Sequence, residues 1–250
     1  MWSTPRIWDE YVNYFQALGY KTHTPALPQH FTANQADHAA DLRLKDYLSQ
    51  LEYDYKRLGE NAIIVGHSMG GLLAQQLAAR VKPSALVLLA PAPPSGHVFF
   101  HPHSFKTLFK QLAIPLFWKR GLKPSPGAAN YGLFNRIPEA QKDSMYQRLC
   151  FSSGRALFEL ALWYADKHRT AAVAVDDVTC PVLTLVGKDD RITPPSACKK
   201  VAELYKQKSH FHQLSQHAHM LTSEPGWEQI AQQIHVWLCW QLGNQEPKAA

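Results

Sequence analysis

The stretch that decides the fold of this chain is residues 62–71, which read Ala-Ile-Ile-Val-Gly-His-Ser-Met-Gly-Gly. A short apolar run leads into Gly-x-Ser-x-Gly, and an apolar helical pattern begins at Leu72. This order predicts a strand, a sharp turn and a helix, with the Ser68 hydroxyl held at the open end of a sheet. We expect Gly66 and Gly70 to make room for the tight backbone, because a Cβ at either position would clash.

A serine in such a turn is a candidate nucleophile, because a hydroxyl reacts readily only when it is held beside a base. The N–H of Met69 opens the helix, and we expect it to point toward the oxyanion that forms when Ser68 attacks a carbonyl. The same short pattern also fits a glycine-rich turn without any chemistry. Residues elsewhere in the sequence are needed to distinguish between these two interpretations.

Length and composition indicate a globular protein of one domain plus an insertion, because 250 residues with 46% hydrophobic and 18% charged side chains can bury one large core. No basic segment followed by an apolar one opens the chain, and no apolar run approaches the roughly 20 residues of a membrane helix. We therefore expect no integral membrane segment. No nucleic-acid-binding motif is found either.

The cysteines are scattered, without a Cys-x-x-Cys pair, at Cys150, Cys180, Cys198 and Cys239. This spacing favours buried thiols in a reducing compartment over a disulfide framework, so we expect a cytoplasmic protein. The oligomeric state is left open by the sequence.

The net charge is +6, and one stretch gathers Lys106, Lys110, Lys119, Arg120 and Lys123. Such a cluster indicates weak attraction to an anionic lipid surface or to an acidic substrate. The alternative interpretation is an ordinary solvated basic face.

Helical and strand patterns alternate at both ends of the chain. We expect helices over residues 2–18, 37–58, 69–81, 196–207 and 227–242, and strands over 20–25, 62–65, 85–90, 181–186 and 209–214. Continuous apolar runs such as 85–90 suit parallel strands that are buried on both faces. The sequence therefore predicts an α/β fold, with a mostly parallel sheet flanked by helices, formed by residues 1–94 and 180–250.

The pattern changes between Ser95 and Thr179, where prolines, glycines and aromatic residues are frequent and no clear buried strand occurs. Residues 151–167 have a helical pattern. We expect residues 95–179 to form a mainly helical cap insertion over the sheet, whose aromatic side chains cover an apolar pocket.

A base and an acid for Ser68 follow two later strands of the predicted sheet. Asp190 comes after the strand at 181–186, and His219 comes after the strand at 209–214. Because the carboxyl ends of parallel strands meet at one edge of a sheet, these side chains can reach the serine. The chain order of serine, aspartate and histidine is the one expected for hydrolases with a strand–turn–helix nucleophile. We predict a catalytic site of Ser68, Asp190 and His219 that needs no metal and no organic cofactor.

Alternatives exist for two of these residues, since Asp189 could be the acid and His217 the base. His67 stands beside the nucleophile, but we expect its side chain to point away from the turn into packing. A further group with metal-binding spacing is His97, His101 and His103. No nearby carboxylate or cysteine completes it, so a surface or lid role is expected.

The chain resembles the α/β-hydrolase superfamily, of the lipase, esterase and lysophospholipase-like kind, over nearly its whole length. Residues 66–71, G-H-S-M-G-G, resemble the nucleophile elbow of that family. Residues 187–194 resemble its G-x-x-D-x-x-x-P acid loop, with the acid at Asp190. Residues 219–227, which include Glu224, resemble its G-H-x-L-x-E-x-P histidine loop, with Ala218 where glycine is usual.

This resemblance implies a serine hydrolase that cleaves a small-molecule carboxylic ester, apolar or lipid-like, through an acyl-enzyme. Acyl transfer, thioester or amide cleavage and haloperoxidase-like chemistry use the same residues. The resemblance therefore leaves the bond that is cleaved open.

The start of the chain departs from the family pattern. Members open with two strands and a third that ends in His-Gly, whose following loop supplies the second oxyanion amide. Residues 1–5 already resemble the residues after that His-Gly, which implies an N-terminally truncated fold. We then expect a gap in the sheet between the strands at Tyr20 and Ala62, and a second oxyanion donor near Met1. The alternative function that follows is a non-catalytic, ligand-binding relative of these hydrolases.

Overall fold

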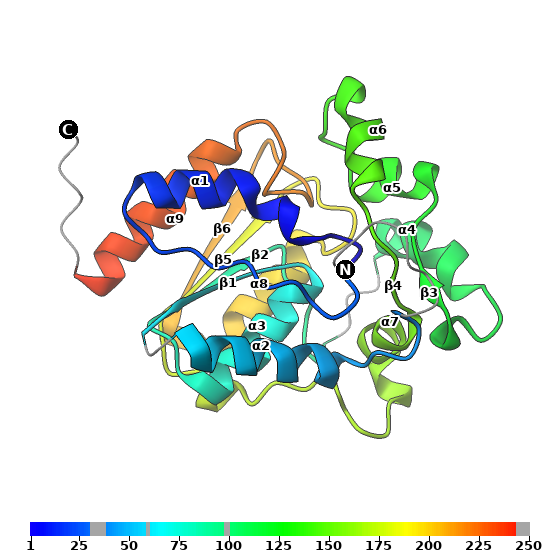
Figure 1. Ribbon diagram of the computed structural model, residues 1–250, viewed down its shortest axis with the longest axis horizontal. Coiled ribbons are helices and arrows are strands. Elements are labelled where there is room, and N and C mark those ends of the chain that lie inside the picture. The colour runs from blue at the N-terminus through cyan, green and yellow to red at the C-terminus, as the bar shows by residue number, and fades with distance from the viewer. Residues whose placement is uncertain (31–38, 59–60, 98–100, 244–250) are drawn as a thin grey trace.

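A computed structural model describes residues 1–30, 39–58, 61–97 and 101–243 of the chain (Figure 1). Its centre is a sheet of four parallel strands in the order β1, β2, β5, β6. Their bounds are Ile63–His67 for β1, Ala85–Leu89 for β2, Val182–Gly187 for β5 and Ser209–Leu214 for β6. The predicted α/β fold with a mostly parallel sheet is confirmed.

Helices cover both faces of this sheet (Figure 1). They are α1 (Asp9–Ala17) and α9 (Trp227–Leu242) on one face, α3 (Met69–Val81) and α8 (Pro195–Leu204) on the other, and α2 (Leu44–Leu58), which packs on α3. Successive side chains of a strand point to opposite faces, so Val87 packs toward α1 and α9 while Leu88 packs toward α3 and α8. Both residues are fully buried, as the apolar run at this strand predicts.

The segment between β2 and β5 is mainly helical and lies beside the sheet (Figure 1). It contains α4 (Pro102–Leu112), α5 (Pro126–Gly132), α6 (Glu139–Gln147), α7 (Gly154–Ala161) and a short antiparallel pair, β3 (Gly121–Leu122) with β4 (Ser152–Ser153). Turns of 3-10 helix complete the described chain at Pro5–Trp8, Phe117–Lys119, Trp163–Ala165, Val175–Asp177 and Lys206–Lys208. The helix expected over 151–167 is therefore shorter, because it starts at α7 and is followed by a separate 3-10 turn.

One buried carboxylate joins this segment to the helices that cover the sheet. Glu159 of α7 is fully buried, and its Oε2 accepts a hydrogen bond from the N–H of Leu44, the first residue of α2, at 2.9 Å. Its Oε1 accepts from Nε of Arg43 at 2.5 Å and from Nε of Arg155 at 3.3 Å. Glu159 thus supplies a hydrogen-bond acceptor to the otherwise unpaired start of α2 and is neutralised by two arginines.

The strand expected over residues 20–25 does not form, and this prediction is wrong. The Tyr20 side chain instead packs against α9, with its hydroxyl 3.1 Å from Nδ1 of His235. β1 is consequently an edge strand in the described part of the chain, and Val65 on it is 37% exposed. The expected gap inside the sheet is replaced by an open edge.

The helix expected over 37–58 begins, as α2, at Leu44, and residues 37 and 38 lie outside the described residues. Among the described residues, no helix is long and apolar enough to cross a bilayer.

Candidate active site

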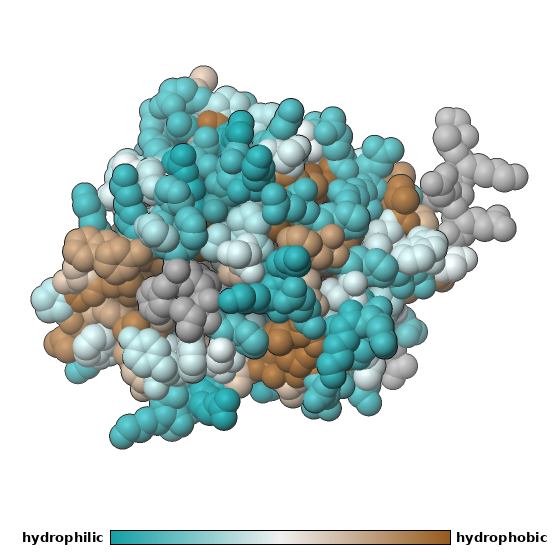
Figure 2. Space-filling model, turned by 180° about the vertical axis from the view of Figure 1, so that it is seen from behind, coloured by the Kyte–Doolittle hydropathy of each residue, from teal (hydrophilic) through white to brown (hydrophobic). Residues whose placement is uncertain are grey.

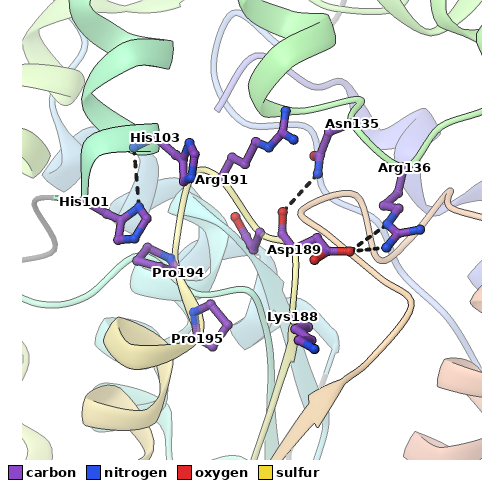
Figure 3. Close-up of a pocket in the computed structure, with 10 residues that line it drawn as sticks. His101, His103, Asn135, Arg136, Lys188, Asp189, Arg191, Pro194 and Pro195 are labelled. Carbon is purple, nitrogen blue, oxygen red and sulfur yellow. Dashed lines mark hydrogen bonds and ion pairs between the residues drawn. The ribbon is translucent and has the colours of Figure 1, made fainter.

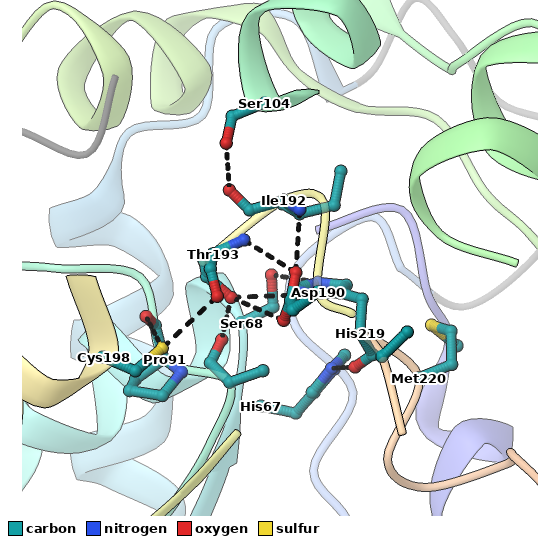
Figure 4. Close-up of polar contacts among 12 residues, drawn as sticks. His67, Ser68, Pro91, Ser104, Asp190, Ile192, Thr193, Cys198, His219 and Met220 are labelled. Atoms are coloured by element: carbon teal, nitrogen blue, oxygen red, sulfur yellow. Dashed lines mark hydrogen bonds and ion pairs between the residues drawn. The ribbon is translucent and has the colours of Figure 1, made fainter. Parts of the chain in front are cut away.

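The turn between β1 and α3 holds Ser68 in a strained backbone conformation, with φ 57° and ψ −124°. The N–H of Ser68 donates to the carbonyl of Leu89 at 3.0 Å, and its carbonyl accepts from Gly71 and from Ala92, both at 2.9 Å. These bonds fix an unfavourable backbone geometry from both sides. They present the partly exposed Ser68 side chain at the carboxyl end of β1 (Figure 4).

Close packing requires glycine at two positions near this turn, Gly66 and Gly71, and the sequence pattern singled out only Gly66 of these two. A Cβ on Gly66 would lie 2.5 Å from Cβ of Ala74, so the prediction for Gly66 is confirmed. A Cβ on Gly70 would have no neighbour within 4 Å, so the prediction for Gly70 is wrong. The second close approach is at Gly71, whose Cβ would lie 2.8 Å from Cβ of Pro91. The start of α3 therefore packs closely at Gly71, one residue later than expected.

Ser68, His219 and Asp190 form one hydrogen-bonded chain (Figure 4). His219 Nε2 lies 3.1 Å from Oγ of Ser68, and His219 Nδ1 lies 2.9 Å from Oδ2 of Asp190. A carboxylate only accepts, so Nδ1 carries the hydrogen and Nε2 is left to accept from the serine hydroxyl. The three side chains that the sequence singled out come from the carboxyl ends of β1, β5 and β6, and the fold brings them together.

The carboxylate of Asp190 is held by its own loop. Its Oδ1 accepts from the N–H groups of Ile192 at 2.7 Å and Thr193 at 2.9 Å. The Thr193 hydroxyl lies 3.0 Å from Oδ2 and 2.9 Å from the carbonyl of Ala90, and its one hydrogen can serve either. Sequence reasoning missed Thr193, although its place inside the acid loop, directly before Pro194, was a signal.

Asp189 has a different environment, in a polar pocket of about 560 Å³ beside the acid loop (Figure 3). Nε of Arg136 donates to Oδ2 of Asp189 at 2.8 Å, and Nδ2 of Asn135 donates to its carbonyl at 3.0 Å. The carboxylate of Asp189 is thus engaged by an arginine and not by His219.

Two members of the histidine cluster line the same pocket (Figure 3). The N–H of His103 donates to Nδ1 of His101 at 3.4 Å, and Nδ1 of His103 lies beside the hydroxyl of Tyr131. No group of three side chains suited to a metal ion occurs within the described residues.

The loop that carries His219 is organised by a second buried carboxylate. Glu224 is fully buried, and it accepts from the N–H of Ala218 at 2.7 Å and of Met220 at 2.9 Å. These bonds flank the histidine on both sides. Nδ1 of His217 lies 3.5 Å from Oε2 of Glu224, so His217 is directed to this carboxylate and not to Ser68. The sequence motif contained Glu224, but the pattern alone gave it no role.

His67 is buried beside His219, with 4.8 Å between the two ring centroids. Burial, and next the neighbouring His219 ring, hold the pKa of His67 well below its usual range, so the side chain is neutral. The N–H of Met69, at the first residue of α3, has no acceptor among the described residues. It is therefore available to a developing negative charge beside Ser68.

Comparison with known proteins places the chain in a family. Residues 1–231 match the family model described as the alpha/beta hydrolase family. A search of curated proteins finds no match.

Solved structures share the fold at low sequence identity. A monoacylglycerol lipase from Paleococcus ferrophilus is 20% identical, with 96% of this chain and 91% of that chain covered and a TM-score of 0.69. A pyrethroid hydrolase from Sphingobium faniae is 16% identical, with 94% and 93% covered and a TM-score of 0.71. A methylesterase from Arabidopsis is 14% identical, with 94% of each chain covered and a TM-score of 0.66. Because the family model spans nearly all of the sequence, the chain belongs to the alpha/beta hydrolase family and is an enzyme of this class.

Proposed function

We propose that this enzyme hydrolyses carboxylic esters through an acyl-serine intermediate. The observation that carries the proposal is the hydrogen-bonded chain from Ser68 through His219 to Asp190. Ser68 Oγ attacks the ester carbonyl while His219 Nε2 takes its proton, and the N–H of Met69 stabilises the oxyanion. His219 then passes the proton to the departing alcohol, and Asp190 holds the imidazole in the tautomer that this requires.

The second half of the reaction uses the same groups. His219 removes a proton from water, the hydroxide attacks the acyl carbonyl, and the proton returns to Oγ of Ser68 as the acid product leaves. Every proton in this cycle is carried by a named side chain, so the proposed steps are complete without a metal or an organic cofactor.

The ester bond is favoured over other acyl bonds by the similar structures, whose titles name a lipase and a methylesterase. We propose that residues 1–94 and 180–250 form the core that carries the site and that residues 95–179 form a cap over it. The aromatic residues of that cap favour an apolar or lipid-like small-molecule ester. The non-catalytic alternative is less favoured, because all three reacting side chains lie within hydrogen-bonding distance of one another.

A cytoplasmic location is proposed on the state of the thiols. The four cysteines, at Cys150, Cys180, Cys198 and Cys239, are all free and buried. Unpaired thiols are typical of proteins in reducing compartments.

The test is the intact mass of the purified chain after exposure to a fluorophosphonate, together with turnover of a short p-nitrophenyl ester. We expect one adduct and measurable turnover, both absent from Ser68→Ala. The matched control is Ser84→Ala, which should label like the parent. It removes a hydroxyl that donates to the Asn61 carbonyl just before β1, at the end of the strand opposite to Ser68. An adduct that persists in Ser68→Ala, or a folded parent chain that neither labels nor turns over ester, overturns the proposal.

A further inference from the structure

Helix α4 is oriented with polar side chains inward and aromatic side chains outward. Its buried face consists of Ser104, Thr107, Leu108 and Gln111. The Ser104 hydroxyl donates to the carbonyl of Ile192 in the acid loop at 2.8 Å, and this bond ties the helix to the core. On the opposite face Phe105 is 50% exposed and Phe109 is 52% exposed. A surface helix normally does the reverse, which indicates that the outer face of α4 has a partner.

The two phenylalanines form a single apolar feature. They stand one helical turn apart, and their ring centroids are 5.2 Å apart. Leu116, four residues beyond the end of the helix, is also 51% exposed. Figure 2 shows an extended apolar area on this side of the molecule, seen from behind. We call Phe105, Phe109 and Leu116 the α4 apolar face.

Cations accompany this face and anions are missing from it. Lys110 and, in the following turn, Lys119 and Arg120 are exposed and make no ion pair within the described chain. Lys106 stands beside Phe105, with its Nζ 4.2 Å from the ring centroid of Tyr131. The sequence contains no aspartate or glutamate between Glu60 and Glu139. These exposed cations are therefore free to attract an anionic surface.

We propose that the α4 apolar face docks on an anionic lipid bilayer. Lys110 directly follows Phe109 in α4, and Lys119 and Arg120 follow Leu116, so exposed cations flank the α4 apolar face. A bilayer surface suits both kinds of group, since phenyl rings enter the boundary below the headgroups while lysine stems extend to the phosphates. A second copy of this chain is disfavoured, because two such faces would bring cations together with no carboxylate between them.

The docking is reversible, because one short amphipathic face supplies a limited apolar area. It does not rest on ester hydrolysis, because none of the residues of the α4 apolar face contacts Ser68, Asp190 or His219. Failure of one proposal therefore leaves the other standing.

The experiment is co-sedimentation of the full chain with vesicles of phosphatidylcholine alone or mixed with phosphatidylglycerol. We expect binding to the mixed vesicles that weakens with added salt, and little binding to phosphatidylcholine alone. The double variant Phe105→Ser/Phe109→Ser should bind at least about tenfold more weakly. Lys110→Gln should bind about fivefold more weakly, which is the loss expected for one cation at the membrane surface.

Matched controls change residues of the same kind elsewhere. Tyr53→Ser removes a ring that is 57% exposed on α2, and Lys199→Gln removes an exposed cation on α8. Both should bind vesicles like the parent, and all four variants should keep the parent's thermal stability within a few degrees.

Two sets of results overturn the proposal. One is equal binding of the parent to both vesicle types, or equal loss of binding in the α4 variants and the controls. The other is vesicle binding that does not depend on Phe105 and Phe109, while self-association in analytical ultracentrifugation, or binding to an acidic protein, does depend on them.

Discussion

The imidazole of His67 donates a hydrogen bond from Nε2 to the main-chain carbonyl of His219, with 2.7 Å between the two atoms. A carbonyl only accepts, so Nε2 carries the hydrogen of the neutral ring. His67, the residue before Ser68, therefore holds the loop that carries His219. Besides their direct hydrogen bond, Ser68 and His219 are thus linked through the side chain of His67.

Replacing His67 tests this coupling. His67→Phe keeps a ring but leaves the His219 carbonyl without a donor, which should cost about 1–3 kcal/mol of stability. Because the imidazole then shifts relative to Ser68, we expect kcat for a soluble ester to fall by roughly ten- to a hundredfold with a smaller change in KM. His67→Gln restores an N–H donor and should recover part of kcat. Equal loss in the two variants would contradict a role for the hydrogen bond.

The two neighbouring aspartates should differ sharply in their effect on activity. Asp190→Asn keeps the shape of the side chain but favours the wrong tautomer of His219, so kcat should fall by about 10⁴-fold. Asp189→Asn removes a partly exposed ion pair with Arg136, which is worth about 1 kcal/mol or less. Its kcat should stay close to that of the parent. Steady-state kinetics on one soluble ester distinguish these outcomes, and the reverse order would reassign the acid.

Alanine at Gly66 and alanine at Gly70 should change stability in opposite directions. Gly66→Ala forces a Cβ against Ala74 and should lower the free energy of unfolding by about 1–3 kcal/mol. Gly70→Ala lies inside α3 with open space around its Cβ, and the better helix propensity should raise that free energy by about 0.5–1 kcal/mol. Urea unfolding of both variants measures the difference. A loss at Gly70 as large as that at Gly66 would disprove the assignment of the close contact.

Acid should destabilise the fold through two buried histidines. Burial lowers the pKa of His30 from 6.5 to about 4, and the pKa of His67 is also well below its usual range. Both are neutral when folded but bind a proton near pH 6.5 when unfolded, so the unfolded state binds more protons as the pH falls. The free energy of unfolding is therefore fully retained above about pH 6.5 and drops by about 1.4 kcal/mol per pH unit for each histidine below it.

Urea unfolding at several pH values between about 7 and about 5 measures this slope. His30→Asn should remove one of the two contributions, and His212→Asn, at an exposed position on β6, should leave the slope unchanged. A parent protein whose stability is flat over this range would contradict the assignment.

The three main residues of the candidate site could be predicted because each of them lies in a short local motif. The turn at Ser68, the acid loop at Asp190 and the loop at His219 each follow an apolar strand, and parallel strands bring their carboxyl ends together whatever the rest of the chain does. The contacts that orient these residues could not be predicted in the same way. Thr193, Glu224 and His67 act through distances between loops that no spacing in the sequence specifies.

The predictions that were wrong depend on which segments of the chain lie beside each other in space. A strand was expected over residues 20–25, yet a strand forms only beside another strand, and Tyr20 packs on α9 instead. Gly70 was misjudged because a Cβ clash depends on the neighbouring chain, here Pro91 opposite Gly71, and not on the motif itself.

The contacts of Glu159 have a consequence for how the protein unfolds. Its carboxylate belongs to α7, outside the sheet, yet it accepts the hydrogen bond at the first turn of α2. If α7 unfolds, α2 loses that acceptor, and Nε of Arg43 loses its partner at the same step. Because the unfolding of α7 removes contacts from α2, and the reverse, the two helices should unfold together. Heating should therefore give one cooperative transition in which the calorimetric and van't Hoff enthalpies agree. Glu159→Gln, which keeps the acceptor for Leu44 but not the charge, should split or broaden that single peak.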